Sequence, residues 1–157
     1  MALRPSWDKV CLDIAETLAK RGTCARRKVG CVLADHRNFI IGTGYNGVAS
    51  GLDHCINSPC FGALLPPGSG TSLYACEAIH AEQNALLQCK DVQQIKTCYV
   101  TYSPCIQCTK LLLNTSCSRV IFLEPSSHNV ESEALWKKAK GPFCWQSYKE
   151  LSEMGYA

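Results

Sequence analysis

The fold is decided by Ala78-Ile79-His80-Ala81-Glu82-Gln83-Asn84-Ala85-Leu86-Leu87, in which a His-x-Glu pattern opens an apolar helix. Further along the chain, Ser103-Pro104-Cys105-Ile106-Gln107-Cys108 places two thiols three residues apart at the start of a second helix. Zinc prefers imidazole nitrogen and thiolate sulfur, and a catalytic zinc site uses three protein ligands and leaves the fourth position to water. His80, Cys105 and Cys108 therefore predict a catalytic zinc site.

Glu82 and Pro104 add two details to this site. In the first turn of a helix, the Glu82 carboxylate can reach toward the zinc-bound water without being a ligand. Pro104 precedes its helix, where a missing N–H costs nothing, and both thiolates then lie near a positively polarised helix N-terminus. Taken singly, a Cys-x-x-Cys is also typical of a redox pair or half of a zinc knuckle. The order of all the parts favours the catalytic zinc site.

Length and composition bound the remaining possibilities. The 157 residues predict one domain over residues 1–157, and the 46% hydrophobic and 18% charged content is typical of a globular protein. A net charge of +3 gives no support for a nucleic-acid partner. The N-terminal residues show no apolar signal region and no stretch reaches transmembrane length, so we expect no membrane partner. The twelve cysteines are then interpreted as reduced thiols of a cytoplasmic protein.

Hydrophobic periodicity and turn signals predict alternating helices and strands. We expect helices at about 7–20 (capped by Ser6), 80–89, 105–114, 129–140 and 145–154, and strands at 29–34, 39–45, 97–101 and 119–123. Residues 35–38 predict a hairpin turn, and a long loop follows from 46 to 72, most turn-like at 66–70. Strand, helix and strand at this spacing predict parallel crossovers. No fifth strand is expected after Leu123.

Beyond the zinc signature, a longer set of motifs carries a family resemblance. These motifs are Cys24-Ala25-Arg26-Arg27-Lys28-Val29-Gly30, Gly44-Tyr45-Asn46-Gly47, Gly51-Leu52-Asp53-His54-Cys55, Cys60 and Cys76. With His80 to Cys108 they make the chain resemble the cytidine and deoxycytidylate deaminase superfamily, and within it the deoxycytidylate (dCMP) deaminases of bacteria and phages. The resemblance implies a three-layer α/β/α fold, a mixed sheet with helices on both faces. It also implies a homo-oligomer, often a hexamer, and dCTP and dTTP are common regulators of relatives.

The resemblance further implies a reaction and a substrate. The reaction is hydrolytic deamination of dCMP, or of a C5-substituted dCMP such as 5-methyl-dCMP, to dUMP or the corresponding dTMP-type product with release of ammonia. An activated water attacks C4 of cytosine, and Glu82 moves protons to the ring nitrogen and the leaving amine. Regulation, and whether C5 must be bare, have no independent signal in the sequence.

Five substrate contacts are expected, each with an ordinary alternative. The resemblance assigns Asn46 to the deoxyribose hydroxyl and the Arg26 region to the phosphate, which a guanidinium binds with a bidentate fork. Tyr102 would stack on the base, and backbone groups of Ser103 and Ala81 would meet the pyrimidine amide. Alternatively, the basic cluster at 26–28 is solvated, Asn46 is a plain turn residue and Tyr102 belongs to the core.

Four cysteines that remain match cysteines of bacterial dCMP deaminases: Cys24, Cys55, Cys60 and Cys76. Four thiolates make a closed structural zinc site, which would tie the long loop to the His80 helix. His54 is a rival for one position, and Glu77 is a weaker one. In the ordinary alternative, some of these residues are simply buried thiols.

Other classes of function use parts of the same pattern. A deaminase of nucleic acid, of a free nucleoside or of adenine shares the zinc motif, although the weak basicity disfavours a nucleic-acid substrate. A non-catalytic zinc-stabilised module would also keep the ligands, but such a module has no need of Glu82.

Overall fold

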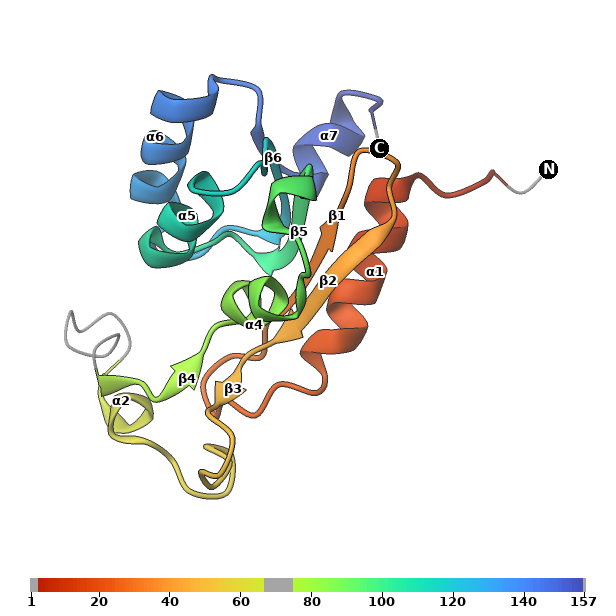
Figure 1. Ribbon diagram of the computed structural model, residues 1–157. Coiled ribbons are helices and arrows are strands. Elements are labelled where there is room, and N and C mark those ends of the chain that lie inside the picture. Colours follow the sequence, from red (N-terminus) through yellow and green to blue (C-terminus); the bar gives the residue numbers. More distant parts are fainter. Residues whose placement is uncertain (1–2, 67–74, 157) are drawn as a thin grey trace.

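The computed structural model describes residues 3–66 and 75–156, and a five-stranded sheet runs through its centre (Figure 1). Its strands are β1 (Gly30–Ala34), β2 (Ile40–Tyr45), β5 (Thr97–Tyr102), β6 (Arg119–Glu124) and β7 (Trp145–Ser147). The strand order is β2-β1-β5-β6-β7. β1 pairs antiparallel with both β2 and β5, whereas β6 pairs parallel with β5 and β7. The expected mixed sheet and its parallel crossover from β5 to β6 are confirmed.

Helices cover both faces of this sheet, so the three-layer α/β/α prediction is confirmed. On one face lie α1 (Trp7–Ala19) and α7 (Tyr148–Glu153); on the other lie α4 (Ala81–Gln88), α5 (Ile106–Leu113) and α6 (Asn129–Lys140). Alternation along β1 explains the two cores. Val32 packs with the Leu12 side of α1, while Leu33 packs with Ala85 of α4.

Local signals in the sequence account for the first helix and the first hairpin. Ser6 caps α1, because its hydroxyl accepts the Lys9 N–H at 3.2 Å. In the turn between β1 and β2, one carboxylate oxygen of Asp35 accepts the N–H groups of Arg37 and Phe39, both at 2.9 Å. Both features were expected from the sequence, at the same residues.

The tail corrects one prediction. Residues 145–154 were expected to form a helix with no further strand, but Trp145–Ser147 forms β7 beside β6 and only Tyr148–Glu153 is helical. The strand has three residues, which is too short to show a period-two pattern. Its formation depends on non-local contacts, since Trp145 is buried against Phe122 of β6 and Trp136 of α6.

The expected long loop also contains regular structure. β3 (Gly47–Val48) pairs antiparallel with β4 (Ala78–Ile79), and α2 (Phe61–Leu64) lies between them in the chain. A short 3-10 helix, Val92–Gln94, precedes β5. The turn expected at 66–70 falls largely outside the described residues. Among the helices of the described ranges, none has the length and apolar character that spanning a membrane requires.

A partly buried ion pair fixes α1 to the sheet. Two nitrogens of Arg119 on β6 donate to the two carboxylate oxygens of Asp8 at 2.8 and 2.6 Å, and the Tyr99 hydroxyl donates to the same carboxylate at 2.7 Å. Burial raises the pKa of Asp8, but the hydrogen bonds from Arg119 and Tyr99 and the charge of Arg119 outweigh it. The net result is a pKa below the ordinary value.

We therefore expect Asp8→Asn to lower the free energy of unfolding by about 2 kcal/mol at pH 7, because it leaves the partly buried Arg119 without its anion. Since the folded-state pKa of Asp8 is depressed, this contribution is complete above the unfolded pKa of about 4 and disappears as pH falls through the folded value. Denaturant melts of wild type and Asp8→Asn at pH 7 and in acid, below the folded-state pKa of Asp8, measure this contribution. Asp13→Asn, on the exposed side of α1, serves as the matched control and should melt like the wild type. A difference between Asp8→Asn and wild type that persists unchanged in acid would contradict this account.

Candidate zinc and active site

The predicted zinc ligands converge where two helices begin. His80 is the N-cap residue of α4, and Cys105 is the N-cap residue of α5 just beyond the carboxyl end of β5. The Nδ1 atom of His80 lies 3.4 Å from the sulfur of Cys105 and 3.4 Å from the sulfur of Cys108. Among the described residues, this is the one group of three or more potential ligands whose donor atoms all lie within 4.8 Å of one another.

These distances fit a tetrahedral zinc ion. With zinc–sulfur and zinc–nitrogen bonds of about 2.3 and 2.0 Å, two tetrahedral ligands should lie about 3.5 Å apart across a nitrogen–sulfur edge. The structure has 3.4 Å on both such edges. One imidazole and two thiolates are also the donor set that zinc prefers, and they leave a fourth position free.

The electrostatics of the two thiols show why a cation suits the site. The hydrogen bond from Cys108, together with the neighbouring His80, lowers the pKa of Cys105 to about 4 against the effect of burial. The hydrogen bond to Cys105 raises the pKa of Cys108, and burial raises it further. Two thiolates so close together, one buried and one half-buried, repel each other, and a divalent cation between them removes this repulsion.

Glu82 lies beside these ligands, at the second position of α4. Its side chain is only 4% exposed. Burial raises the pKa of Glu82 to about 7, although the charge of His80 opposes the shift. The Gln83 side chain accepts the His80 N–H at 2.8 Å and so fixes the start of the helix.

Close contact with β2 sets the position of α4. A Cβ atom added at Gly44 would lie 2.3 Å from the Ala81 carbonyl oxygen, and one at Gly42 would lie 2.7 Å from that of Ala85. The helix therefore rests directly on the strand backbone at these two glycines. The Asn84 amide also donates to the Tyr45 carbonyl at 2.8 Å. Sequence reasoning used Gly44 only as part of a motif and missed this packing role.

Two of the expected substrate contacts lie at the carboxyl end of β5. Ser103 is 3% exposed, and its hydroxyl accepts the Ser126 N–H at 2.8 Å while donating to the Ser126 hydroxyl at 3.1 Å. Tyr102 is half-buried, and the Arg27 guanidinium carbon lies 4.3 Å from its ring centroid. Sequence reasoning gave no special place to Ser126 and did not separate Arg27 from its basic neighbours; no local signal in the sequence marks either contact.

Asn46 and Arg26 both make contacts within the protein. The Asn46 side chain accepts the Val29 N–H at 2.8 Å and donates to the Arg27 carbonyl at 2.7 Å. Arg26 donates to the carbonyl of Gly62 in α2 at 3.0 Å. Ala81 is fully buried at the first position of α4. The expected roles of these three residues toward a substrate stay predictions.

Comparison with known proteins decides the family. Residues 5–124 match the family described as the cytidine and deoxycytidylate deaminase zinc-binding region. The chain belongs to this deaminase family. A deoxycytidylate deaminase of Mycobacterium phage D29 is 40% identical over 129 residues, which cover 78% of this chain and 98% of the phage protein. The deoxycytidylate deaminase of Saccharomyces cerevisiae is 35% identical over 87% of this chain, which spans only 44% of the yeast protein.

Solved structures agree with this assignment at the level of the fold. The dCMP deaminase of cyanophage S-TIM5, crystallised in complex with dCMP and dUMP, aligns with a TM-score of 0.71. The alignment covers 93% of this chain and 99% of the cyanophage chain at 21% sequence identity. The cytidine-deaminase-like fold predicted from the sequence is therefore confirmed for this family member.

The four cysteines expected to hold a second zinc ion are only partly brought together in the structure. The sulfurs of Cys55 and Cys60 lie 3.9 Å apart, and both residues are buried, as is Cys24. Burial raises the pKa of Cys60, but backbone N–H groups of Glu77 and Ala63 and the thiols of Cys55 and Cys76 lower it overall. Among the described residues, no three of the four sulfurs lie within 4.8 Å of one another. The rival ligands His54 and Glu77 are exposed.

The seating of α4 gives a test that needs no substrate. Gly44→Ala should displace the start of α4, because its Cβ would overlap backbone atoms that cannot move independently of the helix. We expect the free energy of unfolding to fall by about 1–3 kcal/mol and less zinc to be bound at His80. Denaturant melts and elemental analysis measure the two effects. Thr43→Ser, one residue away on the same strand, keeps the hydroxyl that donates to Gln88 of α4 at 3.3 Å and should change neither. Wild-type zinc content and stability in Gly44→Ala would show that α4 does not depend on this contact.

Proposed function

We propose that this chain is a zinc-dependent deoxycytidylate deaminase, which converts dCMP and water into dUMP and ammonia. The observation that carries the proposal is the position of Glu82, a buried carboxyl group beside the three convergent donors His80, Cys105 and Cys108. A purely structural zinc site has no use for such a group. The phage relative, matched over 98% of its length, supports the choice of dCMP among cytosine substrates.

The reaction needs a water nucleophile and a group that carries protons. A zinc ion held by His80, Cys105 and Cys108 would lower the pKa of water, so that hydroxide is available near neutral pH. Glu82 accepts one proton from the water and passes it to the ring nitrogen. It then accepts the second proton from the hydroxyl group added at C4 and delivers it to the amine, which leaves as ammonia when the C4–N bond breaks. A carboxyl group whose pKa is raised to about 7 by burial can both accept and release protons near neutral pH.

Backbone groups at the same helix start would orient the pyrimidine. The Ala81 N–H is among the first N–H groups of α4, which have no acceptor within the helix, and it would meet the pyrimidine carbonyl. Ser103, fixed by its two hydrogen bonds with Ser126, would present its backbone to the pyrimidine amide. A C5-substituted dCMP, such as 5-methyl-dCMP, remains within the proposal as a further substrate.

A substrate panel tests the function. Purified protein is given cytidine, deoxycytidine, CMP, dCMP, 5-methyl-dCMP, AMP and a short cytosine-containing oligonucleotide, and ammonia release is measured. We expect turnover of dCMP to exceed that of deoxycytidine, because the proposed substrate carries a 5′-phosphate that the nucleoside lacks. Comparable turnover of deoxycytidine would remove the nucleotide assignment, and turnover of the oligonucleotide alone would favour an editing deaminase.

The role of Glu82 has its own test. Glu82→Gln should lower kcat for dCMP about 100-fold or more, because the amide cannot carry the protons, while fold and zinc content are retained. Glu16→Gln, on the exposed side of α1, should keep wild-type kcat and serves as the control. If Glu82→Gln with full zinc content retained wild-type turnover, another group would have to carry the protons.

We also propose a second, structural zinc ion held by Cys24, Cys55, Cys60 and Cys76. The 3.9 Å between the sulfurs of Cys55 and Cys60 is close to the sulfur–sulfur edge of about 3.8 Å in a tetrahedral site. The lowered pKa of Cys60 favours a thiolate there. The burial of Cys55 and the exposure of its neighbour His54 favour a set of four cysteines. Binding would draw the remaining sulfurs together.

Elemental analysis of protein purified without chelators should then give about two zinc ions per chain. Cys60→Ser should lose one of them and lower the thermal midpoint, because the loop loses its cross-link. Cys144→Ser replaces a half-buried thiol far from both groups in the sequence and should keep two. One zinc ion per wild-type chain would reject the second site.

The homo-oligomer, its possible hexameric state and regulation by dCTP or dTTP stay predictions. Light scattering that gave only the 17.2 kDa monomer would reject the homo-oligomer.

A further inference from the structure

Three consecutive basic residues, Arg26, Arg27 and Lys28, take three different directions. Arg26 donates to the Gly62 carbonyl of α2 and so contacts the long loop. Lys28 lines a groove of about 500 Å³ that also borders Tyr102, and the carboxylates of Asp13 and Glu16 in its lining lie on the α1 side. Arg27 lies over the ring of Tyr102, with 4.3 Å between the guanidinium carbon and the ring centroid. The sequence treats these residues as one cluster, but in the structure each cation makes a different contact, and Arg27 is the one that stacks on Tyr102.

The N–H donors of the Arg27 guanidinium are available to bind a ligand. Within the described ranges, no hydrogen bond or ion pair joins it to another residue, and the four ion pairs found there involve other side chains. A guanidinium that stacks on an aromatic face keeps its N–H groups in its own plane, where they can form a bidentate pair with phosphate oxygens. Arg27 is exposed, so the stacking orients the group while its donors stay available for a ligand.

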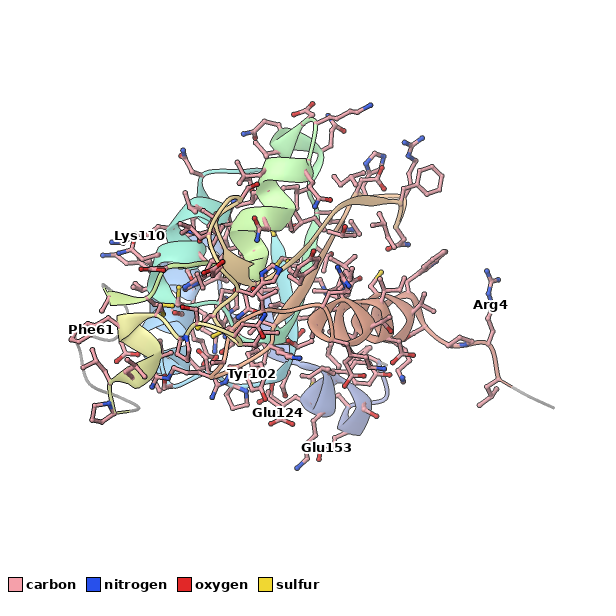
Figure 2. The ribbon with its side chains drawn as sticks, turned by 90° about the horizontal axis from the view of Figure 1, so that it is seen from below. Arg4, Phe61, Tyr102, Lys110, Glu124 and Glu153 are labelled. Carbon is pink, nitrogen blue, oxygen red and sulfur yellow. The ribbon has the colours of Figure 1, made fainter. Side chains whose placement is uncertain are left out.

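Tyr102 links this guanidinium to the zinc ligands by a short, rigid segment. Residues 103 and 104 separate Tyr102 from Cys105, and both are buried. Ser103 is held through its side chain by Ser126, and its N–H donates to the Glu124 carbonyl at 2.9 Å. Figure 2 shows Tyr102 near Glu124, its register partner on β6, at the carboxyl ends of the two strands, with Phe61 of α2 well apart. Three residues span at most about 10 Å, so the ring that lies under Arg27 is close to the zinc ligand Cys105.

The backbone of Arg27 is fixed as well. Asn46 donates to the Arg27 carbonyl and accepts the Val29 N–H, so that one buried amide holds the chain on both sides of Lys28. The point from which the Arg27 side chain departs is therefore set by Asn46, the residue that directly follows β2, the strand on which α4 rests. Arg27 and the zinc ligands share a common support.

We infer that Arg27, stacked on Tyr102, binds the 5′-phosphate of the substrate and selects nucleotides over nucleosides, and that Arg26 does not. This inference rests on the proposed function, because it names the phosphate contact of the same site. It also assigns Asn46 as a positioning residue for Arg27, in addition to the sugar contact that the resemblance implies. The shared chemistry required of the ligand is a phosphate monoester attached to a pentose.

The test compares Arg27→Ala, Arg26→Ala and Lys28→Ala in the full-length zinc-loaded protein. We measure kcat/KM for dCMP and for deoxycytidine, and Ki for deoxyribose 5-phosphate as a competitive inhibitor. Arg27→Ala should lower kcat/KM for dCMP about 10- to 100-fold and raise Ki for deoxyribose 5-phosphate by a similar factor, as expected for loss of a charge-assisted hydrogen-bonding partner. The value for deoxycytidine should stay within about twofold. Lys28→Ala should behave like the wild type, and Arg26→Ala should lower the thermal midpoint without changing the ratio between the two substrates.

The outcomes separate the inference from the proposed function. If wild-type protein deaminates dCMP but the selective loss appears in Arg26→Ala or Lys28→Ala, the inference is wrong and the function stands. If Arg27→Ala lowers kcat/KM equally for dCMP and deoxycytidine, or leaves Ki for deoxyribose 5-phosphate unchanged, Arg27 acts only on the structure. If deoxycytidine turnover is too slow to measure, Ki alone decides between these results. If wild-type protein deaminates no nucleotide, the proposed function itself fails.

Discussion

The direct contact between α4 and the backbone of β2 is the constraint on which the site depends. Gly42 and Gly44 leave no side chain between strand and helix, so the carbonyl oxygens of Ala81 and Ala85 lie where Cβ atoms would otherwise be. Close packing of this kind allows little sliding, because any shift moves backbone against backbone. The helix start that carries His80 is thereby fixed relative to β2. Since β2 pairs with β1 and β1 with β5, the sheet transmits the same position to the cysteine ligands beyond β5.

The site then follows from two helix starts that face one another. His80 occupies the N-cap of α4 and Cys105 the N-cap of α5, so both helices direct unsatisfied N–H groups and positive dipole ends toward the same small volume. Such a volume favours anionic groups, which suits two thiolates and a carboxylate. Burial acts in the opposite direction on Glu82 and raises its pKa to about 7. The balance of the two effects leaves the thiols suited to binding a cation and the carboxyl group suited to carrying protons.

The sequence predicts those parts of the fold and site that depend on short-range spacing. The zinc triad, the parallel crossover from β5 to β6 and the bounds of α6 were predicted from local patterns, whereas the mixed sheet with helices on both faces was implied by the family resemblance. Each is found in the structure. Where long-range contacts determine the structure, sequence patterns led to no prediction or to a wrong one. β7 has three residues and forms only because β6 and α6 supply partners for Trp145. The Arg26 contact with Gly62 spans 36 residues, and no pattern within the basic cluster shows which cation lies over Tyr102.

Asn46 shows why structural and ligand roles at one residue have to be tested through its neighbours. Its amide nitrogen donates one hydrogen to the Arg27 carbonyl, and its oxygen accepts one N–H, from Val29. An amide has a second hydrogen and a second lone pair, so a sugar contact is chemically compatible with this clamp. Removing Asn46 would nevertheless disturb both at once, because the backbone that supports Arg27 would lose its anchor. A change in substrate affinity on substitution of Asn46 therefore does not identify a ligand contact. Substitution of Arg27 identifies one when the loss is selective for the phosphorylated substrate, because its side chain makes no hydrogen bond or ion pair within the described ranges and lies on the Tyr102 ring.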